Sequence, residues 1–217
     1  MPIFLDRRCD EKGETVSPGK EKLDKSFYER SAEEVAKDLL GKYLVSKKNE
    51  GRTVGRIVET EAYLGEEDPA SHSHEGSKTE RTEVMYGPPG HAYIYLIYGM
   101  YNCFNIVTGV EGKPEGVFIR ALEPVEGIKL MKKRRDRNDK SELTSGPGKL
   151  CMAMGIDKKM KGMDLTGDKL YVLEEEQPKD FEIKEAKRIN IDYAGEAKEW
   201  KLRFFIDGNE HVSEESE

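Results

Sequence analysis

The spacing of apolar residues predicts an amphipathic helix near the start of the folded region. In "SAEEVAKDLLG", which begins at Ser31, apolar residues recur three and four positions apart, as on one face of a helix. Ser31 and Glu34 match the capping box that begins many helices, and Gly41 is typical of a helix end. A strand over residues 42–48 is expected to follow.

The segments that come next predict strands separated by a long loop. In "TVGRIVETEAYLG" the alternation of polar and apolar residues places Glu59, Glu61 and Tyr63 on one face of a strand. In "EGVFIRALEPVEG" the same pattern places Arg120 on the face opposite the apolar residues. Between these strands a polar loop is expected over residues 65–90, and a loop of this length is usually functional or disordered.

The segment "YIYLIYGMYNCFNIV" predicts a β-hairpin that is rich in aromatic residues. We expect a rising strand over residues 93–98, a turn at Gly99 and Met100, and a returning strand over residues 102–107. Core packing is the commonest fate of aromatic side chains, so a buried strand pair is one interpretation. Tyr98, however, stands beside the turn, where its own domain would not bury it, and suits insertion into stacked nucleic acid.

The remaining segments mix helices and short strands without a regular βαβ alternation. A helix that carries a basic run is expected from about Val125, and "TSGPGKLCMAMG" predicts a capped helix start. Short strands are expected near residues 169–174, 181–191 and 200–207. This order favours a single compact α+β domain with a mixed or antiparallel sheet, surrounding helices and the protruding hairpin.

Length and polarity divide the chain into a domain and two extensions. The 217 residues suit one domain with additional segments. Residues 1–25 are polar and lack apolar periodicity, which predicts a mobile arm. Residues 26–208 are expected to form the domain, and residues 209–217 an acidic tail.

The charge of the chain is unevenly distributed. A formal net charge of −7 normally argues against nucleic acid as a partner. The segment "KLMKKRRDR", residues 129–137, nevertheless holds six basic residues and one acidic residue in nine positions. Such a run is either a solvated helix face or a locally basic surface that could meet a polyanion.

Cysteine usage and hydropathy indicate a cytoplasmic protein that does not enter a membrane. No apolar run approaches the ~20 residues needed to span a bilayer, and "MPIFLDRRCDEKGE" lacks the apolar centre of a signal peptide. Cys9, Cys103 and Cys151 lie far apart and are odd in number, which is typical of reduced thiols.

Two groups of polar residues could carry chemistry. Glu61 lies near a strand end beside an aromatic residue, which suits a general base, although an edge-strand carboxylate facing solvent is the alternative. Asp68, His72 and His74 could share a metal ion, but no further ligand stands at a recognised spacing. We therefore expect neither a metal nor another cofactor.

A third group, "SGPGK" at residues 145–149, lacks the glycine spacing of a nucleotide-binding loop. It still opens a helix with a lysine nearby, an arrangement that binds a single phosphate well.

Four segments together resemble the alkyladenine (3-methyladenine) DNA glycosylase family of base-excision repair. They are "RIVETEAYLGEEDPASHS", "RTEVMYGPPGHAYIYLIYGMYNCFNIV", "GVFIRALEP" and "SGPGKL", in the order of the family. The likeness extends from about Phe27 to Asp207. It implies a compact α+β domain that inserts a β-hairpin into the minor groove of duplex DNA, flips out a damaged purine and hydrolyses its bond to deoxyribose.

The resemblance also implies roles for individual residues. Glu61 corresponds to the general base that activates the attacking water, and Arg120 to the arginine held close to that water. The flipped base would lie in a slot formed by Tyr63, His72, Tyr95 and Asn105, where Asn105 helps to exclude the exocyclic amine of guanine. Tyr98 would fill the vacated place in the double helix, and the DNA backbone would contact Tyr101, Ser145 and Lys149.

No lysine in the matched segments is placed to form a Schiff base, so a monofunctional hydrolase that leaves an intact abasic site is expected. It would act as a monomer on double-stranded DNA, at the nucleoid if the source is prokaryotic. Three alternatives stay open: a lesion-binding protein without catalysis, a metal-dependent hydrolase that uses Glu61, His72 and His74, and a purely structural role for the tyrosines. Hypoxanthine, 3-methyladenine, 7-methylguanine and ethenoadenine all suit the slot.

Overall fold

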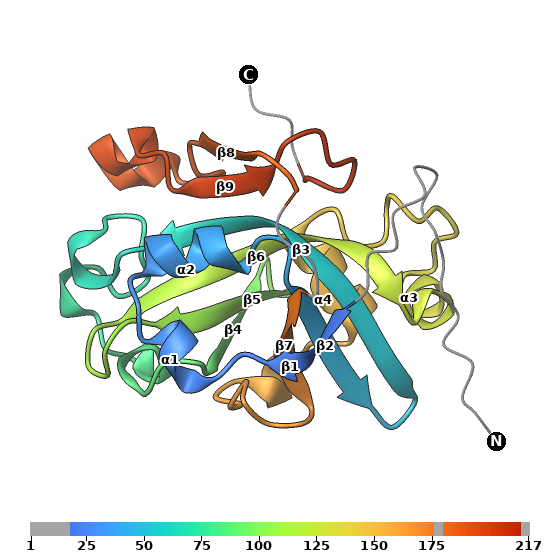
Figure 1. The fold of residues 1–217 in the computed structure, drawn as a ribbon. Coiled ribbons are helices and arrows are strands. Elements are labelled where there is room, and N and C mark those ends of the chain that lie inside the picture. Colours follow the sequence, from blue (N-terminus) through green and yellow to red (C-terminus); the bar gives the residue numbers. More distant parts are fainter. Residues whose placement is uncertain (1–17, 176–179, 214–217) are drawn as a thin grey trace.

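The computed structural model describes residues 18–175 and 180–213. Their strands form one nine-stranded sheet in which every pair is antiparallel (Figure 1). The strands are β1 (Pro18–Lys22), β2 (Tyr43–Lys48), β3 (Gly51–Tyr63), β4 (Ala92–Ile97), β5 (Tyr101–Thr108), β6 (Glu115–Glu126), β7 (Leu170–Glu175), β8 (Ile183–Ala186) and β9 (Arg203–Ile206).

Helices and short 3₁₀ turns surround this sheet, so the expected α+β class is confirmed. The α-helices are α1 (Lys25–Tyr28), α2 (Ala32–Leu39), α3 (Ile128–Arg135) and α4 (Pro147–Met154). The 3₁₀ elements are η1 (Gly65–Glu67), η2 (His74–Gly76), η3 (Glu83–Tyr86), η4 (Lys158–Met160) and η5 (Asp192–Glu199). Within the described part of the chain, no helix is long and apolar enough to cross a membrane.

Helix α2 begins as its sequence predicts. The Ser31 side chain accepts a hydrogen bond from the backbone amide of Glu34, and the Glu34 carboxylate accepts one from the backbone amide of Ser31. Its apolar face is fully buried against the sheet, where the Thr60 hydroxyl of β3 donates to the Ala36 carbonyl at 2.9 Å. The predicted helix is therefore confirmed, and it fixes the face of β3 that turns towards the core.

The long strand β3 is the organising element of the sheet. Its first half pairs with β2, and the stretch around Glu59 and Glu61 pairs with β9 on the same edge. On its other edge it pairs with β6, with register irregularities between Ile57 and Thr60. Because β9 comes from the far end of the chain, β3 joins central and C-terminal residues at one place.

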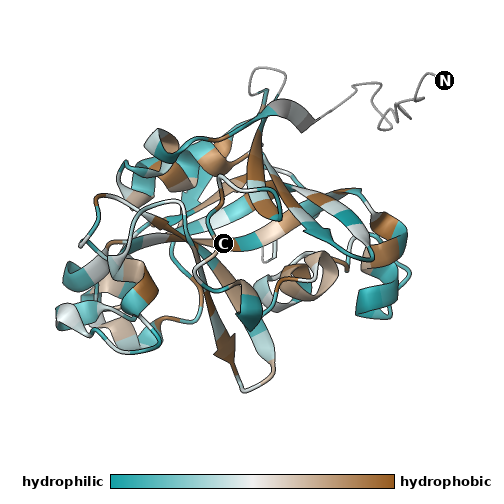
Figure 2. Ribbon diagram, turned by 90° about the horizontal axis from the view of Figure 1, so that it is seen from below, coloured by the Kyte–Doolittle hydropathy of each residue, from teal (hydrophilic) through white to brown (hydrophobic). Residues whose placement is uncertain are grey.

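Strands β4 and β5 form the predicted hairpin, which extends from the body of the molecule at the bottom of Figure 2. The turn lies one residue earlier than expected, at Tyr98 and Gly99, because the Met100 amide donates to the Ile97 carbonyl. Tyr98 and Gly99 both have positive φ, 53° and 71°. This conformation matches the right-handed twist of the two strands.

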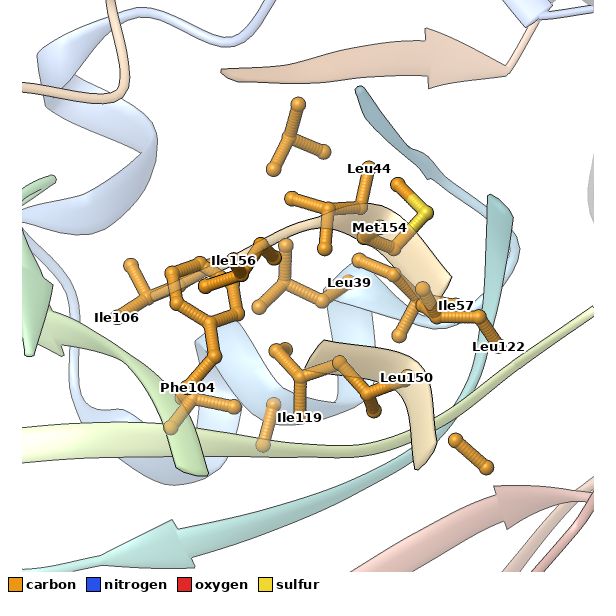
Figure 3. Packing of buried hydrophobic residues seen from close by; sticks show 14 of the residues in the cluster. Leu39, Leu44, Ile57, Phe104, Ile106, Ile119, Leu122, Leu150, Met154 and Ile156 are labelled. Carbon is orange, nitrogen blue, oxygen red and sulfur yellow. The ribbon is translucent and has the colours of Figure 1, made fainter. Parts of the chain in front are cut away.

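One large apolar cluster fills the space between the sheet and helices α2 and α4. Figure 3 shows Leu39 of α2 and Leu150 of α4 packing together with Phe104 and Ile119 of the sheet. All four side chains are fully buried. The cluster packs against β3 and β6, the strands that carry Glu61 and Arg120.

Several expected boundaries are corrected. Helix α3 begins at Ile128 rather than about Val125, because β6 stays paired with β3 as far as Glu126. Helix α4 has Gly146 at its N-cap, without a side-chain cap, and Pro147 at its first turn.

The fold also extends past both bounds expected for the domain, 26 and 208. Of the arm expected over residues 1–25, residues 1–17 lie outside the described residues. Pro18–Lys22 instead form β1, which pairs with β7. Of the tail expected over 209–217, residues 209–213 pack on the domain, and 214–217 lie outside the described residues.

Candidate active site

Two glutamates of β3 are fully buried together with two arginines. Glu59 and Glu61 have no exposed surface, while Arg120 of β6 is 5% exposed and Arg203 of β9 is 2% exposed. Arg120 Nη1 lies 3.2 Å from Glu61 Oε1, and Arg203 Nε donates to Glu59 Oε1 at 2.7 Å. Two acidic and two basic side chains therefore balance each other out of contact with solvent, as buried charges require.

Both oxygens of Glu61 accept hydrogen bonds. Oε1 accepts from the backbone amide of Ile189 at 2.8 Å, besides its contact with Arg120. Oε2 accepts from the Tyr63 hydroxyl at 2.9 Å. These contacts fix the orientation of the carboxylate, and Tyr63 connects it to the pocket described below.

The Arg120 guanidinium remains charged. Burial disfavours its charged form, but the carboxylates of Glu61 and Glu59 outweigh that effect and raise its pKa. Its Nε donates to Glu59 at 2.9 Å. The expected partnership of Glu61 and Arg120 in space is therefore present, and Glu59 is an additional member.

A pocket opens beside this centre and is bounded mainly by aromatic side chains. It contains all four residues that the sequence places around a flipped base, and six others. The lining consists of Tyr63, Ala70, Ser71, His72, Met85, Tyr93, Tyr95, Asn105, Gly116 and Tyr193. The centroids of the His72 and Tyr95 rings lie 4.6 Å apart, with an angle of 83° between the planes. The walls thus combine flat aromatic rings with polar atoms of Ser71, His72 and Asn105.

The His72 ring is held in one neutral form. Its Nε2 lies 3.0 Å from Nη2 of Arg81, and its Nδ1 lies 2.9 Å from the Tyr93 hydroxyl. Because a guanidinium can only donate, Nε2 accepts and Nδ1 carries the hydrogen. Burial and then the charge of Arg81 lower the pKa of His72 to about 4. At neutral pH this wall of the pocket therefore carries no charge on the imidazole.

Tyr93, Tyr95 and Cys103, at or behind the pocket, are also neutral near pH 7. Burial raises the pKa of Tyr93 to about 12, and burial followed by Cys103 raises that of Tyr95 well above its usual value. Burial raises the pKa of the Cys103 thiol to about 11. Asn105 is 7% exposed, and its side-chain amide donates to the Tyr93 carbonyl at 3.3 Å. The pocket therefore suits a planar, largely neutral ligand.

The tyrosines of the hairpin fall into two groups. Tyr93 is buried and Tyr95 half-buried, both at the pocket, whereas Tyr98 at the turn is 79% exposed. Met100 beside it is 66% exposed. A purely structural role for every tyrosine is therefore inconsistent with the exposure of Tyr98, because its side chain lies outside the core.

Three residues expected at a DNA backbone lie near the start of α4. The Lys149 ammonium donates to the Ser145 hydroxyl at 3.3 Å. Tyr101 packs against Gly148, where a Cβ atom would approach the tyrosine side chain to 3.2 Å. The tip of β5 and the first turn of α4 thus form one surface.

The basic run only partly faces solvent. Arg134 Nη1 donates to the Ala153 carbonyl at 2.8 Å, which ties α3 to α4, whereas Lys129, Lys133 and Arg137 are exposed. The exposed residues of the run fit a solvated helix face, whereas Arg134 has a structural contact, and a role of the run at a polyanion stays a prediction.

Asp68 is not a metal ligand in this arrangement, because it binds Arg188. Both carboxylate oxygens face the guanidinium, at 2.5 and 2.9 Å, and the two residues are 0% and 4% exposed. His72 binds Tyr93 and Arg81, and His74 binds the Glu66 carbonyl. No group of three or more His, Cys, Asp or Glu in the described ranges could hold a metal ion.

Several residues of the site carried no signal in the sequence. They are Glu59 as the partner of Arg120, and Arg81, Arg188, Ile189, Tyr193 and Arg203. Strand periodicity places Glu59 beside Glu61 but does not indicate its partner, and neither periodicity nor capping distinguishes the other positions. Aromatic and basic residues are common along this chain, so residue type alone could not identify these positions as part of the site.

Comparison with known proteins gives one consistent result. The sequence model of the family described as "Methylpurine-DNA glycosylase (MPG)" matches residues 26–210. Three similar bacterial proteins bear the name "Putative 3-methyladenine DNA glycosylase". The protein of Clostridium acetobutylicum is 53% identical over 200 residues, which cover 88% of this chain and 97% of the relative. That of Clostridium tetani is 51% identical over 201 residues, with 88% and 98% covered, and that of Natranaerobius thermophilus is 48% identical over 195 residues, also with 88% and 98% covered.

Proposed function

Because the chain belongs to the methylpurine-DNA glycosylase family, whose members hydrolyse N-glycosyl bonds in DNA, we propose that it removes damaged purines from duplex DNA and leaves an intact abasic site. The substrates we propose are alkylated adenine, hypoxanthine and ethenoadenine. The observation that carries the proposal is the buried Glu61–Arg120 pair directly behind an aromatic pocket, joined to it through Tyr63.

Glu61 is proposed to activate the attacking water. As the bond to the base breaks, the sugar gains oxocarbenium character, so a nearby carboxylate favours the transition state electrostatically and also accepts the proton of water. Arg120 keeps the carboxylate charge compensated while it is buried. No cofactor takes part in this scheme.

The flipped base is proposed to stack in the pocket between the rings of Tyr63 and Tyr95, with His72 at its edge. Flipping costs a few kcal/mol, and less for a damaged or mispaired base, so a stacking slot can offset it. The buried amide of Asn105 is proposed to leave no room for the exocyclic amine of guanine.

The hairpin tip is proposed to fill the place that the base leaves. Tyr98 is a large exposed ring on a turn, which is the arrangement of a side chain that wedges between base steps. Phosphates of the same duplex would then contact Tyr101, Ser145 and Lys149. The protein is proposed to act as a monomer with one DNA site. We propose that the reaction takes place in the cytoplasm, at the nucleoid if the source is prokaryotic.

The decisive experiment is single-turnover base release from a duplex with one hypoxanthine, with and without a chelator. It compares the native protein with Glu61→Gln, and uses Glu33→Gln, at an exposed position of α2, as the matched control. We expect release by the native protein and by Glu33→Gln, unaffected by the chelator, and a loss of about 10²- to 10⁴-fold in Glu61→Gln. The strand should remain uncut until it is treated with alkali.

If the native protein released no hypoxanthine, duplexes with methylated and etheno bases would be tested next. Binding to all of these without release would instead support a lesion-binding protein. Inhibition by the chelator would support the metal-dependent alternative.

A further inference from the structure

The chain turns back over the active-site strand after β9. Gly208 has φ +70°, which permits the turn, and the Asn209 amide donates to the Ile206 carbonyl at 3.3 Å. The His211 amide then donates to the Asn209 side chain at 3.0 Å, and the His211 ring is 1% exposed. This anchored turn carries Ser213 to the glutamate pair of β3, 154 positions away in the sequence.

Ser213 contacts both Glu59 and Arg120. Its backbone amide donates to Glu59 Oε2 at 2.7 Å, and its hydroxyl donates to Glu59 Oε1 at 2.9 Å. The same hydroxyl oxygen accepts from Arg120 Nη2 at 3.3 Å. One residue therefore bridges the carboxylate of Glu59 and the guanidinium of Arg120.

Four donors surround the carboxylate of Glu59. Its two oxygens accept from Arg120 Nε, Arg203 Nε and both donors of Ser213. Glu59 is thus placed to hold its neighbours in position. Glu61, in contrast, contacts Tyr63, which lines the pocket.

We propose that Glu59 and Ser213 are positioning residues that direct Arg120 towards Glu61, an inference that rests on the roles proposed for these two residues. A guanidinium is planar and rigid. Glu59 holds Nε and Ser213 holds Nη2, so the remaining nitrogen, Nη1, is fixed 3.2 Å from Glu61.

The hydroxyl of Ser213 has a defined task in this arrangement. Without it, Nη2 of Arg120 loses its acceptor, and a two-bond contact between Arg120 and Glu59 becomes the favoured alternative. Such a contact would draw the guanidinium away from Glu61. The pocket proposed for the flipped base does not include Ser213 or Glu59, so we expect the change to leave DNA binding unaltered.

The kinetic test uses point variants of the full chain. In Ser213→Ala we expect the single-turnover rate of base release to fall about tenfold, the loss typical of a hydrogen bond to a charged group. Affinity for a duplex with an uncleavable lesion analogue should stay unchanged. Ser213→Thr, which keeps both donors, should retain the rate, and Ser26→Ala, at an exposed serine of α1, is the control.

A spectroscopic test reads the position of Arg120 without reference to activity. The Nε–H signal of Arg120, assigned by its loss in Arg120→Lys, should be protected from exchange with solvent in the native protein. In Ser213→Ala, and in Ser213→Gly as a second variant, we expect a changed shift and at least tenfold faster exchange. In the Arg120→Lys background, Ser213→Ala should lower the rate less than twofold, since coupled residues are not additive.

An unchanged rate together with an unchanged Arg120 signal in Ser213→Ala would overturn the proposal. So would equal effects of Ser213→Ala in the native and Arg120→Lys backgrounds, because a merely structural loss acts independently of Arg120. If the native protein released no damaged purine, the function proposed for Glu61 would fail. The Arg120 signal would then decide the positioning by itself.

Discussion

His72 is a histidine whose buried environment keeps it neutral in the folded protein. Its pKa is lowered to about 4, against an ordinary value of 6.5. Between these two values the unfolded chain binds more protons at this position than the folded chain does. The free energy of unfolding must therefore fall as the pH is lowered from about 6.5 to about 4.

We predict that His72→Gln removes part of this pH dependence. Between pH 7 and pH 5 the native protein should lose more unfolding free energy than the variant, by about 1 kcal/mol after allowance for partial exposure. Urea unfolding at the two pH values measures the difference. Equal losses in both proteins would contradict the assignment of His72 as a buried neutral residue.

Asp68 and Arg188 form a second buried ion pair, which holds the loop after β3. Asp68 also accepts from the amides of Leu64 and Ala70. We predict that Asp68→Asn lowers the free energy of unfolding by about 3–5 kcal/mol, because it leaves a buried guanidinium uncompensated. Asp38→Asn, which alters the half-buried pair with Arg30 at the surface, should cost at most about 1 kcal/mol.

Denaturant unfolding of the two variants makes this comparison directly. A small loss in Asp68→Asn, similar to that in Asp38→Asn, would show that Arg188 finds solvent or another acceptor.

The sequence could identify residues that lie in distinctive segments, but not their partners. Glu61 and Tyr63 share a strand face by simple alternation, and their contact follows from it. The contacts of Glu61 with Ile189, and of Glu59 with Arg203, join positions 128 and 144 apart. No local pattern specifies such pairs, since they depend on where β9 meets the sheet.

At the level of elements, the hairpin combines a buried base with an exposed tip. Tyr98 occupies a left-handed backbone conformation that side chains with a Cβ rarely adopt, at a cost of roughly 1 kcal/mol. We predict that Tyr98→Asn leaves the free energy of unfolding unchanged or raises it by up to about 1 kcal/mol, because Asn tolerates this conformation. Base release should nevertheless be impaired, since the wedge is lost.

Phe104→Ala serves as the contrast within the same hairpin. Its ring is fully buried, so the truncation should cost about 3–5 kcal/mol. Thermal melts and single-turnover base release, measured on both variants, test whether the hairpin base stabilises the fold while its tip serves base release. A large loss of stability in Tyr98→Asn would show that the tip packs on the domain.

Elements with complete local signals could be predicted, whereas those completed by distant pairing could not. The helix after Ser31 has its capping box and apolar face within eleven residues, and the structure confirms it. Strand β6 runs past the expected helix start because Glu126 pairs with Val54, more than seventy positions earlier. In the hairpin the Met100 amide donates to the Ile97 carbonyl, so Tyr98 and Gly99 form the centre of the turn, between the paired residues Ile97 and Tyr101.

At the scale of the whole molecule, an acidic protein presents a small basic surface. The net charge is −7, yet the exposed Lys149 lies beside Ser145 at the start of α4. We predict that affinity for undamaged duplex falls with salt, and that Lys149→Gln reduces the slope of log Kd against log salt by about 1. Fluorescence anisotropy at several salt concentrations measures this slope.

Lys25→Gln, in helix α1 and well apart from α4 in Figure 1, carries the same charge change and should leave the slope unaltered. Equal reductions in both variants would mean that overall charge, rather than a phosphate contact at Lys149, controls binding.

The pairing of β9 with β3 has a consequence for the order in which the molecule is made. Strands β4 and β5 and the basic helix α3 are complete once the first two-thirds of the chain has been synthesised. The carboxylate centre needs Ile189, Arg203 and Ser213, which are synthesised after all of these elements. Contacts over such long separations also form slowly during folding. A growing chain can therefore form the hairpin and helix α3 before the residues that surround Glu59 and Glu61 are all present, and the chemistry proposed for Glu61 requires these later residues.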